Sequence, residues 1–416
     1  MRPFDTVSGE GFHQVAQTLI DIGAKFGAVD ATAILPHRQT VCDRAKAQAS
    51  IDKEKLSEAI QRAISSNGGI AVTTDMWTDE FKKRAYTVLT SHYICDWELV
   101  NRILATVEFD HTLKKTSENL HEQITSVLSS YGILPDQAVF VTDQGSNIKA
   151  ALRCYHWIPC SAHILNTVLR HTFGKKHAAV DGIEDVLDMI DYCKELVAYL
   201  KRTGATASLK HTVNQECDKH CEPKFGDVPY MRSLRSRASV LLDEKMRPTA
   251  SHKIATFLHP KYKALKMLME EEREEVLKQV RELLLAEGGT RVRQEEDESN
   301  PTTSTEQASG AKKSKTDVTE WEDDDTGPVD EVQDYSSTNF DLGSVDENLL
   351  SFWKAQGQTF PRLQHLAKRI LSIPATSAAS ERSFSAAGRV IEARRSRLNP
   401  DTVDAILFLH SAKKKK

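Results

Sequence analysis

The chain has 416 residues, of which 40% are hydrophobic, and its formal net charge at pH 7 is -4. This length allows two or three domains with a sizeable core, and the near-neutral charge excludes a globally basic nucleic-acid binder, so any contact with DNA must come from local basic patches. No apolar run of about 18 residues occurs, so we expect no membrane contact through a spanning helix. The seven scattered cysteines favour a reducing compartment over a disulfide framework.

The first part of the chain has the pattern of helices. Apolar residues recur at helical spacing over residues 12–22 and 56–64. Asn67-Gly68-Gly69 then breaks the pattern. We therefore predict a helical N-terminal segment over residues 1–66.

A block rich in β-branched and aromatic residues follows. The predicted strands are 70–74, 84–95, 97–109 and 138–142. The predicted helices are 116–131, 147–152 and 161–173. Three strands joined by short turns, then a crossover helix and a further strand, describe a mixed sheet with helices on its faces. Because the ribonuclease-H-like fold has this order, we predict an α/β fold in which residues 67–180 form the first part of such a core.

Two aspartates stand at the ends of predicted strands. Asp75 follows Ile70 to Thr74, and Asp143 follows Val139 to Thr142. Carboxylates at neighbouring strand ends are hard oxygen ligands for Mg²⁺, which needs few protein ligands because it keeps waters and binds substrate phosphates. Two such ions can clamp the attacking and leaving oxygens of a phosphodiester exchange. Either aspartate alone is more typical of a turn or a helix cap than of a metal site.

The rest of the chain divides by composition. Residues 181–286 are predicted to form a helical insertion, and 287–345 a disordered acidic and Ser/Thr-rich linker. Residues 346–412 regain the amphipathic pattern of helices.

The C-terminal residues carry a resemblance to a known family. Leu371-Ser-Ile-Pro-Ala-Thr-Ser-Ala-Ala-Ser-Glu-Arg-Ser-Phe-Ser385, together with residues 394–398 and 405–409, resembles the C-terminal dimerisation region of hAT transposases (the hobo, Activator and Tam3 superfamily). Residues 1–40 resemble the helical segment that follows a BED zinc finger in such proteins, and both Asp motifs match as well. The resemblance covers most of the chain, and it implies a nuclear protein that binds DNA and forms a homodimer or higher oligomer through residues 346–412, which complete the core.

The resemblance also implies roles for particular residues. Glu381 would be the third catalytic carboxylate, so that Asp75, Asp143 and Glu381 bind Mg²⁺ or Mn²⁺. Cys160-x-x-His163 matches a family motif and supplies only two of the four ligands of a zinc site, so we expect a structural pair and no zinc. Arg394, Arg395 and Arg397 would contact DNA phosphates, or else belong to a solvated loop held by salt bridges. The predicted dimerisation residues are Phe352, Trp353, Ile406, Leu407, Phe408 and Leu409.

The sequence departs from the family pattern in two ways. No BED finger precedes Asp75, and Cys217-Asp218 is followed by Lys219-His220-Cys221 in place of an Arg-Trp pair, within an insertion that is shorter than in the family. In the family that Trp stacks on a flipped base during hairpin formation. Base stacking on an aromatic side chain is worth about 1–3 kcal/mol, so its loss should impair strand transfer.

Three functions follow as expectations. The first is a domesticated or decayed transposase-derived nuclear protein that dimerises and binds DNA, with a possible role in regulating transcription. The alternative is an active DDE transposase that performs metal-dependent cleavage and transfer of DNA strands. The second alternative is a protein-interaction scaffold that does not bind DNA.

Overall fold

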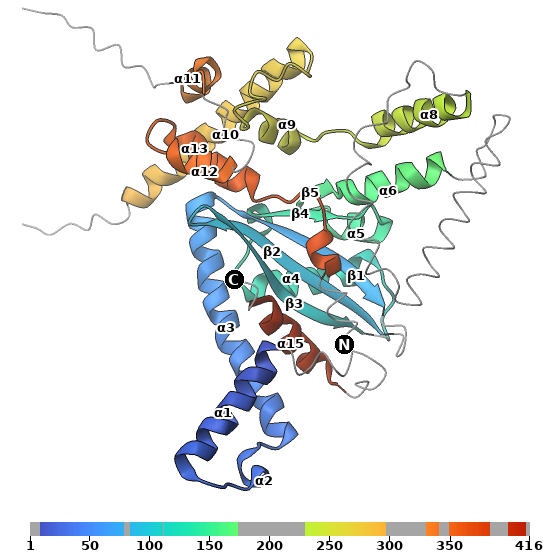
Figure 1. Cartoon of the computed structure of the whole chain (residues 1–416). Helices are drawn as coiled ribbons and strands as arrows, with labels where there is room; N and C mark the ends of the chain where they lie inside the picture. Colours follow the sequence, from blue (N-terminus) through green and yellow to red (C-terminus); the bar gives the residue numbers. More distant parts are fainter. Residues whose placement is uncertain are drawn as a thin grey trace, which may run out of the picture.

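The computed structural model describes residues 9–78, 84–110, 112–173, 229–296, 330–340, 349–382 and 398–412. A mixed sheet flanked by helices and a cluster of further helices make up this part of the chain (Figure 1).

A five-stranded sheet has the order β3-β2-β1-β4-β5. Its strands are β1 (Ile70–Thr78), β2 (Ala85–Cys95), β3 (Glu98–Phe109), β4 (Ala138–Thr142) and β5 (His156–Pro159). The first three strands pair antiparallel, whereas β4 is parallel to both β1 and β5. This is the predicted ribonuclease-H-like mixed sheet, and the predicted fold class is confirmed. The sequence does not predict β5, because four residues that include a proline show no recognisable period.

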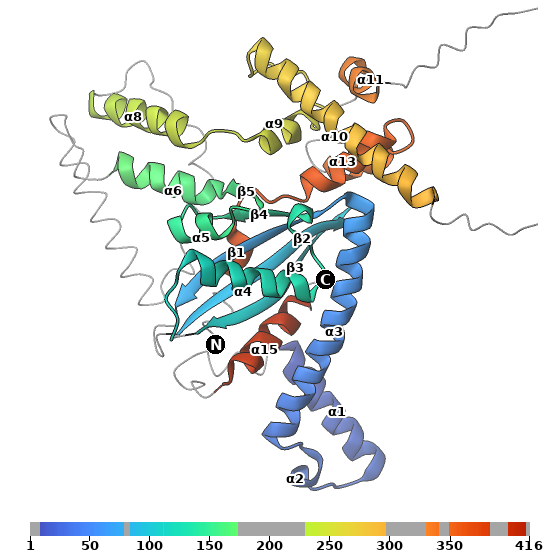
Figure 2. The same ribbon diagram turned by 180° about the vertical axis from the view of Figure 1, so that it is seen from behind.

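Helices cover both faces of the sheet, as Figures 1 and 2 show from opposite sides. The covering helices are α3 (Arg38–Asn67), α4 (Ser117–Ser130) and α15 (Pro400–Ala412). Successive residues of a strand point to opposite faces. Accordingly Leu89 of β2 joins the core shared with α3 and α4, and Val88 packs with Leu407 of α15. Nearly all of β2 is buried because both of its faces are covered.

Further elements lie around the sheet and at the N-terminus. They are α1 (Glu10–Phe26), α2 (Ala31–Ile34), η2 (Pro135–Gln137), α5 (Ser146–Ala151), α6 (Ser161–Thr172) and α8 (Pro229–Lys245). The helix α8 packs against α6. None of the helices in the described ranges is both long enough and apolar enough to cross a membrane.

A second apolar core lies among helices at one end of the sheet. These helices are α9 (Ala250–Phe257), α10 (Glu270–Glu296), α11 (Glu331–Ser337), α12 (Leu349–Ala355) and α13 (Pro361–Leu371). At its centre the hydroxyl of Tyr335 and the indole N–H of Trp353 both donate to the carbonyl oxygen of Leu258, at 3.1 Å and 3.0 Å. Segments on both sides of residues 297–329 therefore form one packed unit.

Two predicted boundaries in this region are wrong. Within the predicted helical insertion, α10 begins at Glu270 after a series of turns. The linker predicted over 287–345 contains helix at both ends, because α10 continues to Glu296 and α11 begins at Glu331. Only three residues of α11 are buried, so the helix hardly alters the charged composition from which the linker was predicted. The rest of that linker, apart from Asp330 and residues 338–340, lies outside the described residues, as do residues 181–228 of the predicted insertion.

The C-terminal helices divide between the two cores. The helices α12 and α13 pack mainly in the second core, while α15 lies on the sheet. Asp404 of α15 holds this position, since its carboxylate accepts a hydrogen bond from the backbone N–H of Thr106 at 2.7 Å and from Lys53 Nζ at 2.6 Å.

The substitution Asp404→Ala should lower the free energy of unfolding by about 1–3 kcal/mol, the usual cost of losing hydrogen bonds to a half-buried charged group. Denaturant unfolding of the purified chain measures this change. Asp401→Ala is the matched control, because Asp401 is exposed in the first turn of the same helix. Equal losses for the two variants would contradict a docking role for Asp404.

Candidate active site

Asp75 and Asp143 lie side by side at one edge of the sheet. In the parallel ladder between β1 and β4, Thr73 pairs with Val141. Each aspartate stands two residues beyond this pair, and adjacent strands are separated by about 4.8 Å. The strand pairing therefore brings together two carboxylates that are far apart in the sequence.

The local backbone holds both carboxylates in place. Oδ1 of Asp75 accepts from the N–H of Met76 at 2.8 Å, and Oδ1 of Asp143 accepts from the N–H of Gly145 at 3.2 Å. A Cβ atom at Gly145 would lie 3.3 Å from that same Oδ1. The glycine thus leaves room for the Asp143 carboxylate where the chain turns into α5.

Glu381 reaches this edge from the C-terminal part of the chain. It lies in a helical turn at residues 378–382, in which the N–H groups of Ser380 and Glu381 donate to the carbonyl oxygen of Ser377. Ser377 and Ser380 are completely buried, and their small side chains allow the turn to lie close against the sheet. Oε1 of Glu381 lies 3.8 Å from Nδ1 of His163 on α6.

The start of α6 fastens the segment that leads to Glu381. The backbone N–H of Ser377 donates to Sγ of Cys160 at 3.3 Å, and the N–H of Ser161 donates to the carbonyl oxygen of Ala375 at 3.0 Å. Cys160 is buried and its own N–H donates to Thr142 at the end of β4. The Cys160-x-x-His163 motif therefore places a buried anchor and a half-exposed imidazole beside the three carboxylates.

The charges of these groups influence one another's pKa values. Burial raises the pKa of Asp75 to about 6, and the negative charges of Asp143 and Glu381 add to the rise. Burial lowers the pKa of His163, but the Cys160 thiol and the neighbouring carboxylates outweigh burial and raise the value overall. Burial raises the pKa of Cys160, but hydrogen bonds from Ser377 and His163 outweigh burial and lower the value overall. Negative charge is thus concentrated around a partly desolvated Asp75.

The donor atoms match a divalent cation in chemical kind. Carboxylate oxygens are the ligands that Mg²⁺ and Mn²⁺ prefer, and a cation would relieve the like charge that raises the pKa of Asp75. Among the described residues, no group of three or more His, Cys, Asp or Glu side chains could hold an ion as they lie. Mg²⁺ commonly uses one or two protein carboxylates together with waters and substrate phosphates, so the set suits such an ion without forming a closed protein cage.

Two groups of predicted site residues are not part of this arrangement. Arg394, Arg395 and Arg397 lie outside the described residues. Trp353, Leu407 and Phe408 are buried against the chain's own helices and strands, and Phe352, Ile406 and Leu409 are partly buried. Their proposed role in dimerisation stays a prediction.

Sequence patterns missed three polar residues behind the carboxylates, namely Thr73, His92 and Ser380. All three are buried and hydrogen-bonded in series. The available signals were weak: His92 is a titratable residue within an otherwise buried strand, and Thr73 precedes Asp75 by two positions on the same face of β1.

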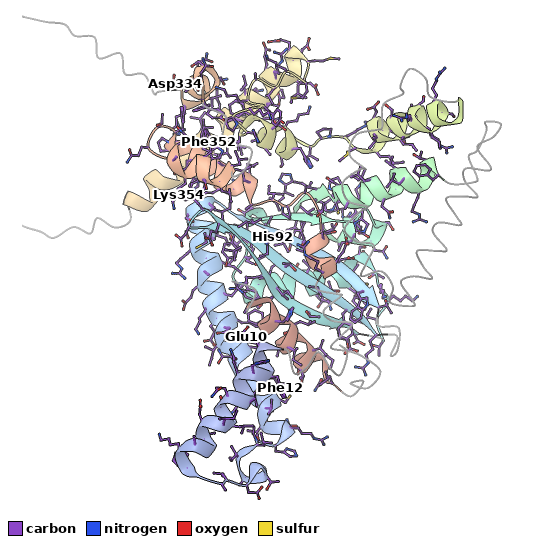
Figure 3. The ribbon with its side chains drawn as sticks, viewed as in Figure 1. Glu10, Phe12, His92, Asp334, Phe352 and Lys354 are labelled. Carbon is purple, nitrogen blue, oxygen red and sulfur yellow. The ribbon has the colours of Figure 1, made fainter. Side chains whose placement is uncertain are left out.

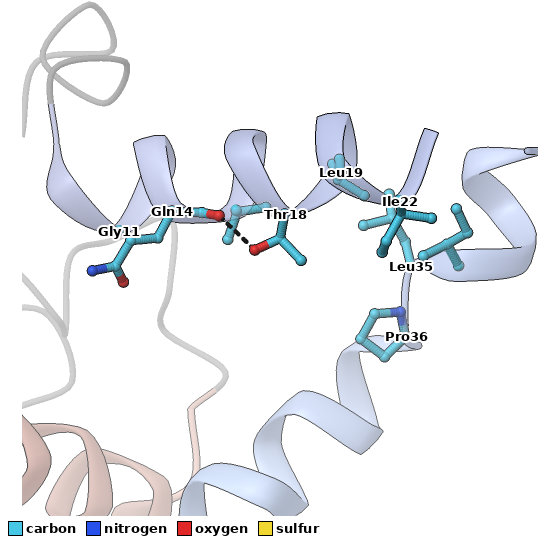
Figure 4. A pocket seen from close by; sticks show the side chains of 9 residues that line it. Gly11, Gln14, Thr18, Leu19, Ile22, Leu35 and Pro36 are labelled. Atoms are coloured by element: carbon cyan, nitrogen blue, oxygen red, sulfur yellow. Dashed lines mark hydrogen bonds between the residues drawn. The ribbon is translucent and has the colours of Figure 1, made fainter. Parts of the chain in front are cut away.

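A separate hollow lies on the N-terminal helices, away from the carboxylates. It has a volume of about 490 Å³ and lies between α1 and the chain after α2, lined by Gly11, Gln14, Val15, Thr18, Leu19, Ile22, Ile34, Leu35 and Pro36 (Figure 4). No residue of α1 is buried. This helix therefore presents apolar side chains, such as Phe12, Val15 and Phe26, to the surroundings of the single chain.

Three protein families match separate parts of the chain. The hAT family C-terminal dimerisation region matches residues 331–412, the Hermes transposase DNA-binding domain matches residues 1–40, and the ZBED1 RNase-like domain matches residues 73–156. Over 218 residues the chain is 30% identical to the transposable element hobo transposase of Drosophila melanogaster, a match that covers 52% of this chain and 32% of that protein.

The chain is therefore similar to hAT transposases in residues 1–40 and 331–412, and to the hobo transposase over half of its length. Over 206 residues it is also 23% identical to zinc finger protein 618 of Mus musculus and of Homo sapiens, covering 50% of this chain and 20% of each relative. A match to the putative AC transposase of Zea mays has 33% identity over 88 residues, or 21% of this chain and 11% of that protein. The chain thus spans about a third or less of the hAT relatives and zinc finger proteins that it matches.

The substitution Asp75→Asn should stabilise the metal-free protein. A carboxyl whose pKa is raised from 3.8 to about 6 in the folded state costs stability at pH values above about 6, and this cost disappears as the pH falls below 3.8. At about pH 7.5 we expect a gain on the order of 2 kcal/mol in the free energy of unfolding, shrinking towards about pH 4. Denaturant unfolding in the presence of a chelator measures it.

Asp136→Asn is the control for this experiment, because Asp136 is exposed. It should leave the stability nearly unchanged at both pH values. A destabilised Asp75→Asn protein at neutral pH would show that the ionised carboxylate is favourably paired, contrary to the arrangement described above.

Proposed function

We propose that this chain is a transposase-derived nuclear protein that binds DNA, dimerises and retains a metal-dependent centre able to nick a DNA strand. The match of residues 1–40 to a transposase DNA-binding domain supports DNA binding, and the match of residues 331–412 to a dimerisation region supports dimerisation. The observation that supports the nicking activity is the convergence of Asp75, Asp143 and Glu381, with the pKa of Asp75 raised to about 6. Grouping three carboxylates disfavours the ionised form of Asp75 and so costs stability. A protein that served only as a scaffold would gain nothing from that cost.

The side chains have distinct tasks in this proposal. When bound, divalent cations would supply an activated water and would stabilise the charge on the attacking and leaving oxygens. Asp75 and Asp143 are held by backbone N–H groups and present fixed oxygens to the cation. His163 lies beside Glu381 and, with its raised pKa, can carry positive charge towards a scissile phosphate. The product of hydrolysis is a nick with a free 3′-hydroxyl.

Strand transfer is expected to be the weaker activity. The sequence Cys217-Asp218-Lys219-His220-Cys221 lacks the Arg-Trp pair that the family resemblance leads us to expect. Stacking of a flipped base on an aromatic residue contributes about 1–3 kcal/mol. Its loss affects the step in which the freed 3′-hydroxyl attacks the opposite strand, and it leaves the first hydrolysis unaffected.

Cleavage of labelled duplex DNA tests the proposal. With Mg²⁺ or Mn²⁺, the wild-type chain should produce nicks in excess of hairpin or joined products, and Asp143→Asn should reduce nicking by at least about 100-fold, as expected for loss of a group that acts on the transition state. Asp136→Asn, on the surface, is the matched control and should nick normally.

A second function is favoured by the match to zinc finger protein 618, which spans half of this chain. In this alternative the chain binds DNA as a dimer, with a role in regulating transcription, and has no catalytic activity. A folded dimer that retains DNA at low salt and never nicks it would support the alternative. A dimer that also fails to retain DNA would leave only a protein-interaction scaffold.

Metal affinity should depend on pH in a defined direction. A proton and a cation compete for Asp75, so the affinity for Mn²⁺ should fall as the pH drops below about 6, by at most about tenfold per pH unit. Calorimetric titration with Mn²⁺ at several pH values measures this dependence. Because Asp143 contributes to the raised pKa of Asp75, Asp143→Asn should weaken binding and move the midpoint to lower pH. An affinity that does not change between about pH 5 and pH 7.5 would exclude Asp75 as a ligand.

A further inference from the structure

A series of hydrogen-bonded polar side chains crosses the sheet behind the carboxylates. We name it the polar chain, and it consists of Asn101 on β3, His92 on β2, Thr73 on β1 and Ser380 in the turn at residues 378–382. Asn101 Oδ1 lies 2.5 Å from His92 Nδ1, His92 Nε2 lies 2.9 Å from Thr73 Oγ1, and Thr73 Oγ1 lies 2.8 Å from Ser380 Oγ. Figure 3 labels His92 within the sheet.

The polar chain is buried at every position except its outer end. His92 is 1% exposed and Thr73 and Ser380 are completely buried, whereas Asn101 is at the surface. Buried polar groups are stable only when they are hydrogen-bonded. Three strands and a distant C-terminal turn therefore depend on one another for the satisfaction of these groups.

A neutral imidazole gives the polar chain one consistent direction. With its proton on Nδ1, His92 donates to Asn101, Nε2 accepts from the Thr73 hydroxyl, and Thr73 in turn accepts from Ser380. Burial lowers the pKa of His92 to about 4, although the hydrogen bond to Asn101 opposes this change. The imidazole is therefore neutral at physiological pH, and each group in the series has a partner.

Other threonines of the same sheet show that this bonding is selective. The hydroxyls of Thr74, Thr87, Thr90 and Thr106 are also buried, but they have no hydrogen-bond partner among the described residues. Thr73 differs from its neighbour Thr74 in pointing to the opposite face of β1. Asp75, two residues after Thr73, lies on the same face of β1 as Thr73.

We propose that the polar chain positions Glu381 against Asp75, with Thr73 and Ser380 acting as positioning residues for the carboxylate centre. Thr73 and Asp75 belong to one rigid strand, while Ser380 and Glu381 are adjacent in one helical turn. A single hydrogen bond between Thr73 and Ser380 therefore connects the strand that carries the first carboxylate to the turn that carries the third. This inference rests on the proposed function for its role in metal binding, but not for its role in fixing the turn.

A second attachment explains why a single bond is sufficient. Cys160 and Ser161 hold the segment at Ser377 and Ala375, on the side of the turn that faces α6. With only this attachment the turn could pivot about Ser377. The bond from Ser380 to Thr73 adds a second fixed point three residues later, which removes that freedom and determines where the Glu381 side chain begins.

Thr73→Val and Ser380→Ala test the proposal, and Thr74→Val is the matched control. Each test variant removes one hydroxyl with little change in volume. Thr74→Val also removes a buried hydroxyl from β1, but this hydroxyl has no hydrogen-bond partner among the described residues. Two measurements are made on the full chain. Hydrogen exchange followed by mass spectrometry reports on the backbone of residues 376–382, and titration with Mn²⁺ alone reports on the carboxylate centre.

In both test variants the backbone amides of residues 376–382 should exchange their hydrogens about 2- to 10-fold faster. The affinity for Mn²⁺ should fall by about 2- to 10-fold as well, since both ranges correspond to the loss of one buried hydrogen bond. The double variant Thr73→Val/Ser380→Ala should be no worse than Thr73→Val alone, because Thr73→Val already removes the bond to Ser380. Thr74→Val should match the wild type in both measurements. A purely structural role would lower the stability of Thr73→Val, Ser380→Ala and the double variant without weakening their affinity for Mn²⁺.

The outcomes separate this inference from the proposed function. If Thr73→Val and Thr74→Val give the same exchange rates in residues 376–382, the polar chain does not position the turn and the inference is overturned. If the wild type binds no Mn²⁺ and nicks no DNA while exchange still distinguishes the variants, the proposed function fails and the positioning of the Glu381 turn stands.

Discussion

The parallel pairing of β1 with β4 is the constraint on which the site depends. It fixes two carboxylates at one edge of the sheet, and it does so through backbone hydrogen bonds that any compatible sequence could make. The parallel ladder needs a crossover between the strands, which α4 supplies while covering one face of the sheet. The same edge then accepts α6 and the turn that carries Glu381, because β5 continues the parallel pairing and delivers Cys160 directly after Pro159.

This arrangement places function in conflict with stability. Asp75 is partly buried beside two other carboxylates, and its raised pKa shows that ionisation is disfavoured in the folded chain. The surroundings compensate where they can: Met76 donates a hydrogen bond to the carboxylate, and the positive character of His163 partly offsets the like charge. Sites that are strained in this way persist when the rest of the fold supports them. Here the support comes from a sheet that is buried on both faces and from two attachments of the Glu381 turn.

The sequence predicts the sheet well because its signals are local. Strand β4 begins and ends where its run of apolar and β-branched residues indicates, and Asp143 follows its last residue. Strand β1 continues to Thr78, beyond the predicted end at residue 74, because residues 75–78 go on pairing with β2, so Asp75 lies within its strand. Glu381 could be assigned only by resemblance, since nothing in a small-residue helix indicates which strand it will approach. The hydrogen bonds of Thr73 and Ser380 join residues more than 300 positions apart, and no periodicity records such a contact. The burial of Trp353 in the second core could not be predicted either. The apolar face of an amphipathic helix has the same sequence pattern whether it packs against its own chain or against another.

The second core explains how a long stretch of chain can separate Asp143 from Glu381 without loosening the site. Arg281 of α10 pairs with Asp330 just before α11, and the buried carboxylate of Glu331 accepts hydrogen bonds from the N–H groups of Arg362 and Leu363 at the start of α13. These contacts pin the chain on both sides of residues 297–329. The position of Glu381 is therefore set by the packing of α9 to α13 and by the attachments that follow.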